Sequence, residues 1–310
     1  ELAALYKQFM SGELPDLKNN ASLFEFPKAD ATRNTSFAVL NKLADLIPNL
    51  IGGSADLAPS NKSNMKKRGD FTATDKSGSN IHFGIREHAM AAIANGMQLH
   101  GGLRAYCATF FIFSDYMKHA MRLSALMHLP VTYILTHDSI GVGEDGPTHE
   151  PVEQLIALRS IPNMKVFRPA DGKETAAAWI SALTGNSPTC LVLTRQNLPQ
   201  YEKSGLDALK GAYVLADSEK KVPDVLLIAS GSEVEQCMQA KEILKGKGVD
   251  ARVVSMPCME EFEKQPQSYK DEVLPPEVKA RVCVEAASPW SWYKYAGDCG
   301  EIIGMTTFGA

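Results

Sequence analysis

A carboxylate at the expected start of a helix, Glu87, is the residue of this chain that could most readily do chemistry. Residues 80–83 are predicted to be extended, Gly84 interrupts them, and 86–99 are predicted to be helical. Four apolar residues of this stretch stand four apart, as on one helix face: Ile85, Ala89, Ile93 and Met97. A lone carboxylate in a first helical turn is usually only matched to the helix dipole, so a functional reading needs a second feature.

Aromatic residues about one β–α unit later supply that feature. Phe110, Phe113 and Tyr116, with Phe111 among them, begin where a predicted strand ends. A carboxyl group packed near aromatic rings has a raised pKa and can hold or share a proton near neutral pH. Aromatic residues at helical spacing are more often core than cofactor site, but a pocket for a flat ring is a second interpretation here.

Further polar candidates follow predicted strands at their carboxyl ends, the edge where open α/β sheets bind ligands. They comprise residues 52–57 with Asp56 and Leu57, Glu87, residues 109–113, His137 with Asp138, and Arg195 with Gln196. This convergence on one edge is stronger evidence for a site than any single motif.

The loop 141–146 matches the pattern G-x-G-x-x-G after a strand, which can indicate a nucleotide site. We reject that interpretation because Glu144 and Asp145 would repel a pyrophosphate, and two prolines interrupt the helix that should hold it. Asp145 and His149 suit a polyol better, since a carboxylate accepts hydrogen bonds from hydroxyls and an imidazole can donate or accept.

Four residues could bind a phosphate: Arg33, Ser60, His137 and Arg195. Arginine offers a fork of donors that matches phosphate geometry. Taken singly, Arg33 is more simply explained as a solvated residue at a helix start, and Ser60 as a turn residue. His137 is harder to dismiss, because it follows an apolar strand. The remaining histidines show no metal-ligand spacing, so no metal site is expected in this chain.

The elements that must position these residues alternate between strand and helix from residue 32 onward. Expected strands are 50–53, 81–83, 104–109, 131–136, 165–168 and 190–194, and expected helices are 32–46, 86–99, 114–127, 150–160 and 172–183. A second unit has strands at 225–229, 251–255 and 281–285. The fold class is therefore α/β, with two domains of mostly parallel sheets flanked by helices, at 31–200 and 211–310, after a linker at 1–30.

Bulk properties narrow the class of protein. The net charge of −4 gives no argument for nucleic acid, and no apolar run approaches the ~20 residues that span a membrane. Six scattered cysteines without metal spacing indicate buried reduced thiols and a cytoplasmic protein. The chain begins with Glu1 and stops at 308–310 without a tail, so we expect a piece of a longer polypeptide that is truncated in its C-terminal domain.

The chain resembles the single-chain transketolases in ordered blocks along nearly its whole length. These blocks are 31–33, 52–61, 84–90, 136–149, 168–172, 195–199 and 292–297. Deoxyxylulose-phosphate synthases and pyruvate dehydrogenase β chains carry a different run around the glutamate, whereas dihydroxyacetone synthase is closer.

The resemblance implies reversible transfer of a two-carbon ketol group from a ketose phosphate to an aldose phosphate, through the carbanion of thiamine diphosphate. It implies a homodimer, a place in the pentose phosphate pathway, and a divalent metal, Mg or Ca. That metal and the diphosphate would be held by a preceding domain with a Gly-Asp-Gly triplet, which this chain lacks. The fold would be the thiamine-diphosphate-binding fold followed by a smaller transketolase C-terminal-like domain, and the piece alone is expected to be inactive.

By the same resemblance, Glu87 would bond the pyrimidine nitrogen of the cofactor and favour its imino tautomer. The cofactor pocket would comprise Asp56, Leu57, Glu87, Phe110, Phe113 and Tyr116. Sugar phosphates would be held by Arg33, Ser60, His137, Asp145, His149 and Arg195, with His149 joining Glu87 as a catalytic residue. Alternatives are a dihydroxyacetone synthase-like ketol transferase, a non-catalytic dimerising module and a nucleotide-dependent oxidoreductase that uses the 141–146 loop.

Overall fold

A six-stranded parallel sheet forms the first half of the computed structural model, which describes residues 2–309. The strand order is β3-β2-β4-β5-β7-β6. The strands are β2 (Leu50–Ser54), β3 (Asn80–His82), β4 (Arg104–Phe110), β5 (Thr132–Thr136), β6 (Lys165–Phe167) and β7 (Thr189–Leu193). Buried Val, Ile and Leu side chains recur along these strands, as expected for a sheet that is covered on both faces.

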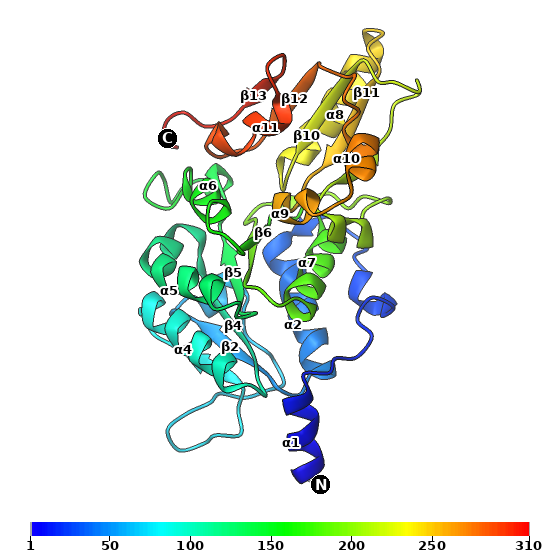
Figure 1. The fold of residues 1–310 in the computed structure, drawn as a ribbon. Coiled ribbons are helices and arrows are strands. Elements are labelled where there is room, and N and C mark those ends of the chain that lie inside the picture. Colours follow the sequence, from blue (N-terminus) through cyan, green and yellow to red (C-terminus); the bar gives the residue numbers. More distant parts are fainter. Residues whose placement is uncertain (1, 310) are drawn as a thin grey trace.

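Helices cover both faces of this sheet (Figure 1). One face packs against α4 (Glu87–His100), α5 (Ser114–Leu126) and α6 (Gln154–Arg159), and the other against α2 (Thr32–Leu46) and α7 (Gly172–Thr184). Short elements complete this half: α1 (Leu2–Ser11), α3 (Ala58–Asn61), and a two-residue ladder of β1 (Asp30–Ala31) with β8 (Asn197–Leu198).

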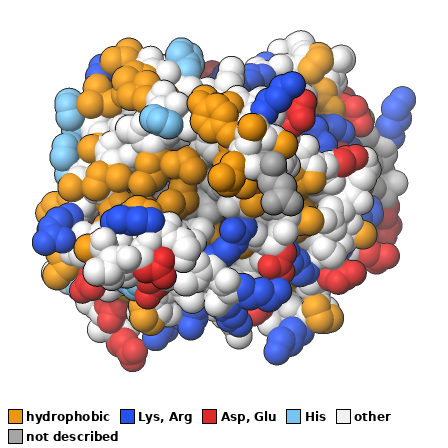
Figure 2. Space-filling view, turned by 90° about the horizontal axis from the view of Figure 1, so that it is seen from below, with side chains coloured by type: hydrophobic (Ala, Val, Ile, Leu, Met, Phe, Trp, Pro, Cys, Tyr) orange, Lys and Arg blue, Asp and Glu red, His pale blue; other side chains and the backbone are white. Residues whose placement is uncertain are grey.

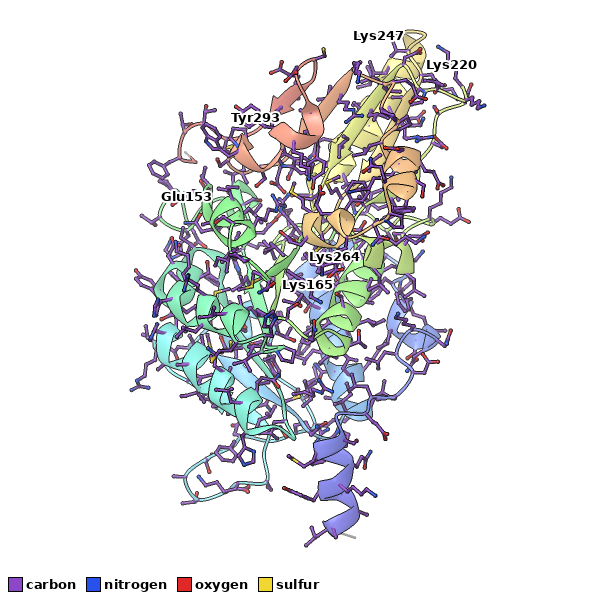
Figure 3. The ribbon with its side chains drawn as sticks, viewed as in Figure 1. Glu153, Lys165, Lys220, Lys247, Lys264 and Tyr293 are labelled. Carbon is purple, nitrogen blue, oxygen red and sulfur yellow. The ribbon has the colours of Figure 1, made fainter. Side chains whose placement is uncertain are left out.

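The second half is a five-stranded sheet in the order β13-β12-β10-β11-β9, of which only β9 pairs antiparallel. Its strands are β9 (Tyr213–Ala216), β10 (Val225–Ala229), β11 (Ala251–Ser255), β12 (Arg281–Val284) and β13 (Glu301–Ile303). Its helices are α8 (Glu233–Gly246), α9 (Met259–Glu263), α10 (Gln267–Val273) and α11 (Tyr293–Ala296). Figure 3 places Lys220 and Lys247 at the far end of this half, away from the first sheet.

Buried charges join the two halves. Arg159 makes a two-pronged ion pair with Glu285, at 2.7 and 2.8 Å. Glu174, at the start of α7, accepts hydrogen bonds from Tyr213 Oη at 2.7 Å and Ser255 Oγ at 2.6 Å. Burial raises the pKa of the Glu174 carboxyl to about 7, and the negative charge of neighbouring Asp171 adds to the effect. The halves therefore share one polar, water-excluded interface.

The structure confirms the α/β prediction and most expected elements, including the helix 32–46. The helix expected at 150–160 is shorter, because α6 begins only at Gln154. Of the four apolar residues that stand four apart, Ile85, Ala89 and Ile93 are exposed and only Met97 packs against the core. Ile85 and Ile93 are 80% and 46% exposed, whereas the buried residues of α4 are Glu87, Met90, Ala91, Ala94 and Asn95. No described helix is both long and apolar enough to cross a bilayer.

Candidate active site at the carboxyl edge of the first sheet

The parallel strands bring most of the sequence candidates to one edge, because their carboxyl ends point the same way. Asp56 and Leu57 follow β2, Glu87 follows β3, and the Phe110 region ends β4. His137 comes directly after β5, and Arg195 comes two residues after β7. Asp56 and His137 both have left-handed backbones, with φ of 62° each, which non-glycine residues rarely adopt. Such backbone strain is typical of functional sites.

Arg33, Ser60 and His137 are in direct contact at this edge. Arg33 Nη1 donates to the backbone oxygen of Ser60 at 2.9 Å and lies 3.3 Å from His137 Nε2. Burial, together with the positive charge of Arg195, lowers the pKa of Arg33. The buried Nε of Arg33 has no hydrogen-bond partner among residues 2–309. Two arginines that repel each other, one of them with an unused donor, form a site suited to an anion.

His137 is held neutral at this site. Burial lowers its pKa to about 4, and the charges of Arg33 and Arg195 act in the same direction. Because a guanidinium can only donate, His137 Nε2 accepts from Arg33 and the ring proton belongs on Nδ1. Nδ1 lies 2.9 Å from Thr136 Oγ1, which can accept that proton's hydrogen bond.

The predicted aromatic residues form a continuous wall with two histidines. The Phe110 ring lies 3.7 Å from that of His137 and stacks on Phe113 at 5.9 Å, as measured between centroids. Phe113 contacts Tyr116 at 6.0 Å and His149 edge-on at 5.5 Å. Phe110 is buried, but Tyr116 is 68% exposed. The wall thus offers flat apolar surface that a ligand could cover.

Glu87 is the first residue of α4 and is only 8% exposed. Its carboxylate forms no hydrogen bond or ion pair with any described residue. The residue as a whole is buried, but its carboxylate oxygens are not among the fully buried atoms that lack a partner, so they remain open at the edge, where a ligand donor can reach them. The expected proton affinity of Glu87 stays a prediction.

The loop after β2 is fixed by Ser54, which sequence reasoning missed. Ser54 Oγ donates to Ala108 O at 3.1 Å and accepts from Leu57 N at 3.2 Å and Asn61 Nδ2 at 2.7 Å. The side chain of Asp56 is exposed, and Leu57 is half-buried. Short polar residues directly after a glycine-ended strand were the available signal for Ser54.

The 141–146 loop does not lead into a helix, which supports the rejection of a nucleotide site. A short 3₁₀ turn, Ile140–Val142, is followed by irregular chain until Gln154. A Cβ on Gly141 would overlap the side-chain amide of Gln196, so this glycine serves loop packing. Glu144 lies 3.4 Å from Arg195, and His149 Nδ1 lies 2.9 Å from Thr148 Oγ1.

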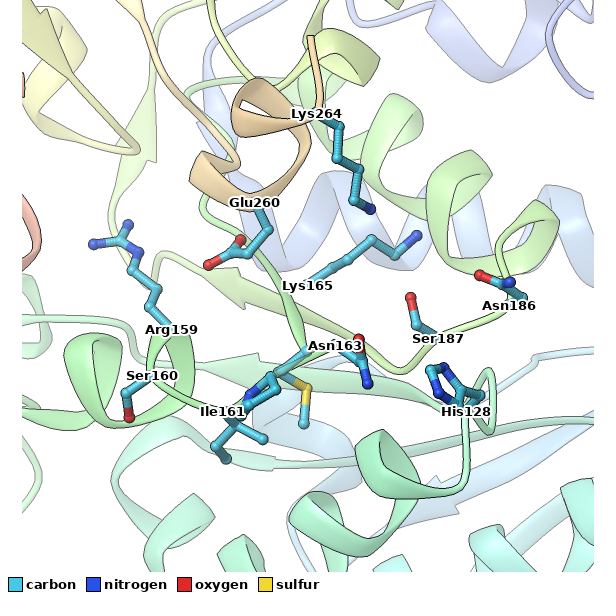
Figure 4. A pocket seen from close by; sticks show the side chains of 12 residues that line it. His128, Arg159, Ser160, Ile161, Asn163, Lys165, Asn186, Ser187, Glu260 and Lys264 are labelled. Atoms are coloured by element: carbon cyan, nitrogen blue, oxygen red, sulfur yellow. The ribbon is translucent and has the colours of Figure 1, made fainter.

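A cavity of about 450 Å³ lies elsewhere, where β6 and β7 begin (Figure 4). Lys165 and Lys264 line it, whereas the guanidinium of Arg159 points away from both. Lys165 Nζ donates to Ser181 O at 2.8 Å, and Lys264 pairs with Glu261 at 2.9 Å. These cations are already satisfied and lie at the amino edge of the sheet, so this cavity is separate from the candidate site. Nowhere in residues 2–309 do three metal-ligand side chains gather.

Comparisons with known proteins identify the family of both halves of the chain. A family described as "Transketolase, pyrimidine binding domain" matches residues 28–200, and "Transketolase-like TK C-terminal domain" matches 211–310. Transketolase of Bacillus subtilis is 54% identical over 316 residues, covering 100% of this chain and 47% of that protein. The chain therefore spans about half the length of the curated relatives it matches.

Solved structures give the same result. Transketolase from Leishmania mexicana matches with a TM-score of 0.94 and 44% identity, covering 99% of this chain and 45% of that one. Transketolase from Pichia stipitis in complex with sedoheptulose-7-phosphate matches with a TM-score of 0.92 and 43% identity, covering 100% of this chain and 46% of that one.

Proposed function

Because the chain belongs to the transketolase family, we propose that it supplies the pyrimidine side of a transketolase active site. The reaction is reversible transfer of a two-carbon ketol group from a ketose phosphate to an aldose phosphate. The observation that carries the proposal is the presence, on one sheet edge, of Glu87, whose carboxylate has no partner among the described residues, and of a cationic group at Arg33 and Arg195 that the exposed Glu144 offsets only in part.

The cationic group is the proposed phosphate site. Arg33 and Arg195 offer charged donors. His137 Nε2 accepts a hydrogen bond from Arg33 and so holds its guanidinium in place. Asp145 and His149, on the loop that also carries the Arg195 partner Glu144, would contact the sugar hydroxyls. The Pichia stipitis relative, solved with a sugar phosphate, supports this class of substrate. Ser60 contributes its backbone oxygen to Arg33, and its hydroxyl remains a candidate phosphate donor.

Thiamine diphosphate fits the residues around Glu87. A carboxylate with no partner among the described residues suits a protonated ring nitrogen, and the half-exposed aromatic wall of Phe110, Phe113 and Tyr116 suits a flat heterocycle. When bound, this cofactor supplies the nucleophilic carbon that accepts the ketol group. Glu87 holds the proton at the ring nitrogen, Asp56 and Leu57 line the pocket, and His149 handles protons on the substrate side.

The diphosphate and its divalent metal, Mg or Ca, are assigned to the part of the relatives that this chain does not cover. The domains proposed are 31–200, for the pyrimidine, and 211–310, which packs against the first domain through buried ion pairs. Without the metal side, the chain alone is proposed to be inactive.

A homodimer is proposed from an exposed apolar surface on α4 and α5. It includes Ile85, just before α4, Ile93 and Leu99 of α4, and Tyr116 and Leu126 of α5. His88 and His119 stack across the two helices at 6.3 Å between ring centroids. Figure 2 shows hydrophobic and histidine side chains gathered on this side of the molecule. Contiguous exposed apolar surface of this kind is typical of protein interfaces.

A cytoplasmic location and a place in the pentose phosphate pathway complete the proposal. All six cysteines are free and five are buried, which suits a reducing compartment.

The test is Glu87→Ala in the full-length enzyme. We expect ketol transfer to fall by about a thousandfold or more, since a residue of the chemical step is removed, while the melting temperature stays close to wild type. Glu235→Ala, in the first turn of α8, is the matched control and should retain full activity. Near-normal turnover in Glu87→Ala would refute the assignment and favour a module that only dimerises.

A further inference from the structure

A buried chain of charged side chains lies directly behind His137. Asp138, the next residue, is fully buried, and its Oδ2 accepts from Arg168 Nε at 2.9 Å and pairs with Nη2 at 2.8 Å. Arg168 is itself fully buried and follows β6, two strands away from β5 in the sheet. The Arg168 guanidinium therefore fixes the position of the Asp138 carboxylate.

The second domain holds the other side of this guanidinium. Arg168 Nη1 donates to Ser230 O at 2.9 Å and to the Glu233 carboxylate, and Nη2 donates to Ser232 Oγ at 3.1 Å. Gly231 has a φ of 56°, and a Cβ there would lie 2.8 Å from the guanidinium carbon. Its N–H also donates to Arg168 O at 2.9 Å. The turn that leads into α8 thus holds Arg168 through both its backbone and its side chains.

His137 depends on its surroundings because its backbone is left-handed, with a φ of 62°. A non-glycine residue keeps such a conformation only where neighbouring contacts over-determine it. Thr136 and Phe110 hold the ring on one side. On the other side the chain continues immediately into Asp138, whose position is set by Arg168.

We propose that Arg168, acting through Asp138, is a positioning residue that holds His137 and Arg33 in register for the substrate phosphate. The inference rests on the proposed function, since it takes the phosphate site from there. Arg168 does not bind the phosphate: its donors are taken up by Asp138, Ser230, Ser232 and Glu233. The second domain thereby sets the geometry of the phosphate site in the first.

The test compares a phosphorylated aldose acceptor with the same aldose lacking its phosphate, in the full-length enzyme. Asp138→Asn keeps the shape of the side chain but loses the charge that fixes it on Arg168. We expect the KM for the phosphorylated acceptor to rise about ten- to a hundredfold, because displacement of a binding group by about 1 Å has effects of this size. The KM for the unphosphorylated acceptor and kcat should stay within about twofold.

Glu174→Gln is the matched control, because it alters an equally buried carboxyl group between the domains that contacts neither Asp138 nor Arg168. It should lower the melting temperature and leave the ratio of the two KM values unchanged. Should Asp138→Asn fail to fold, Ser232→Ala removes one Arg168 contact more gently and should raise the phosphorylated KM by a few-fold.

Inorganic phosphate gives a second measurement on the chain itself. In NMR titrations, phosphate should shift the His137 imidazole signals of the wild type at lower concentrations than those of Ser232→Ala. Equal KM changes for both acceptors, or unchanged phosphate binding, would overturn the inference. If Arg33→Gln also leaves the phosphorylated KM unchanged, the phosphate site itself fails and the proposed function with it.

Discussion

At the scale of single residues, the site combines a neutral histidine with a carboxylate that has no partner among the described residues. His137 is neutral because burial and two arginines depress its pKa, whereas the carboxylate of the mostly buried Glu87 stays open to a ligand. Sequence patterns found both residues, because each directly follows a strand or begins a helix. They did not find Ser54 or Arg168, whose importance depends on contacts between distant segments.

His137 makes stability pH-dependent in a definite direction. Its pKa falls from 6.5 to about 4 on folding, so the unfolded chain binds the proton more tightly. The histidine contribution is present above pH 6.5 and is lost as the pH falls towards 4, and it amounts to at most about 3 kcal/mol. Denaturant unfolding of wild type and His137→Gln between pH 4 and 7 measures it. An equal slope of stability with pH in the two proteins would contradict this assignment.

Arg195→Gln should weaken the binding of a phosphorylated substrate while leaving the stability of the protein nearly unchanged. Arg195 is partly exposed, and its one described ion pair is with Glu144, whose side chain is 84% exposed, so little stability is lost. A lost charged hydrogen bond to phosphate costs about 1.5–3 kcal/mol, so the KM for a phosphorylated substrate should rise at least tenfold. Glu144→Gln is the control and should not raise it. Steady-state kinetics of both variants decide the matter.

At the scale of elements, periodicity predicted where α4 lies but not which of its faces is buried. Ile85 and Ile93 of the four-apart set are exposed, Met97 packs against the core, and the buried face carries small residues such as Ala91 and Ala94. Close packing of α4 against α5 and β4 needs small side chains on the buried face. Large apolar side chains can then lie on the exposed face, where a second protein chain could cover them. Hydrophobic spacing alone cannot distinguish these two uses of an apolar face.

Replacing two glycines of the first half by alanine should change the free energy of unfolding in opposite directions. A Cβ on Gly53 would overlap the Ile81 backbone oxygen, so Gly53→Ala should destabilise the chain by about 3 kcal/mol or more. Gly96 lies inside α4 with open space around it, so Gly96→Ala should stabilise by about 0.5–1 kcal/mol. Urea unfolding measures both, and a stabilising Gly53→Ala would show that the strand spacing is wrong.

At the scale of the whole molecule, the α/β class was predictable because alternating strands and helices leave few other packings. The Arg159–Glu285 ion pair and the hydrogen-bonded Glu174 carboxyl between the two halves were not predictable, since these residues look like ordinary surface residues in sequence. These side chains are buried only because the two halves pack against each other. These contacts make the second domain a support for the first.

This shared interface predicts that the two domains unfold together. Breaking one partner of a buried pair typically costs about 3–5 kcal/mol, so Arg159→Met should lower the single transition rather than split it. Calorimetry of the chain checks this. Two separate transitions in the wild type would mean that the halves are energetically independent.

Reconstitution tests the central claim that this chain is half of a ketol-transfer site. The chain is mixed with a polypeptide carrying the remaining half of a transketolase relative, thiamine diphosphate and magnesium, and association is verified by sedimentation. We predict transfer from a ketose phosphate to an aldose phosphate only when both polypeptides are present, and none with Glu87→Ala. Activity of the chain alone, or an associated complex that stays inactive with the wild-type chain, would contradict the account.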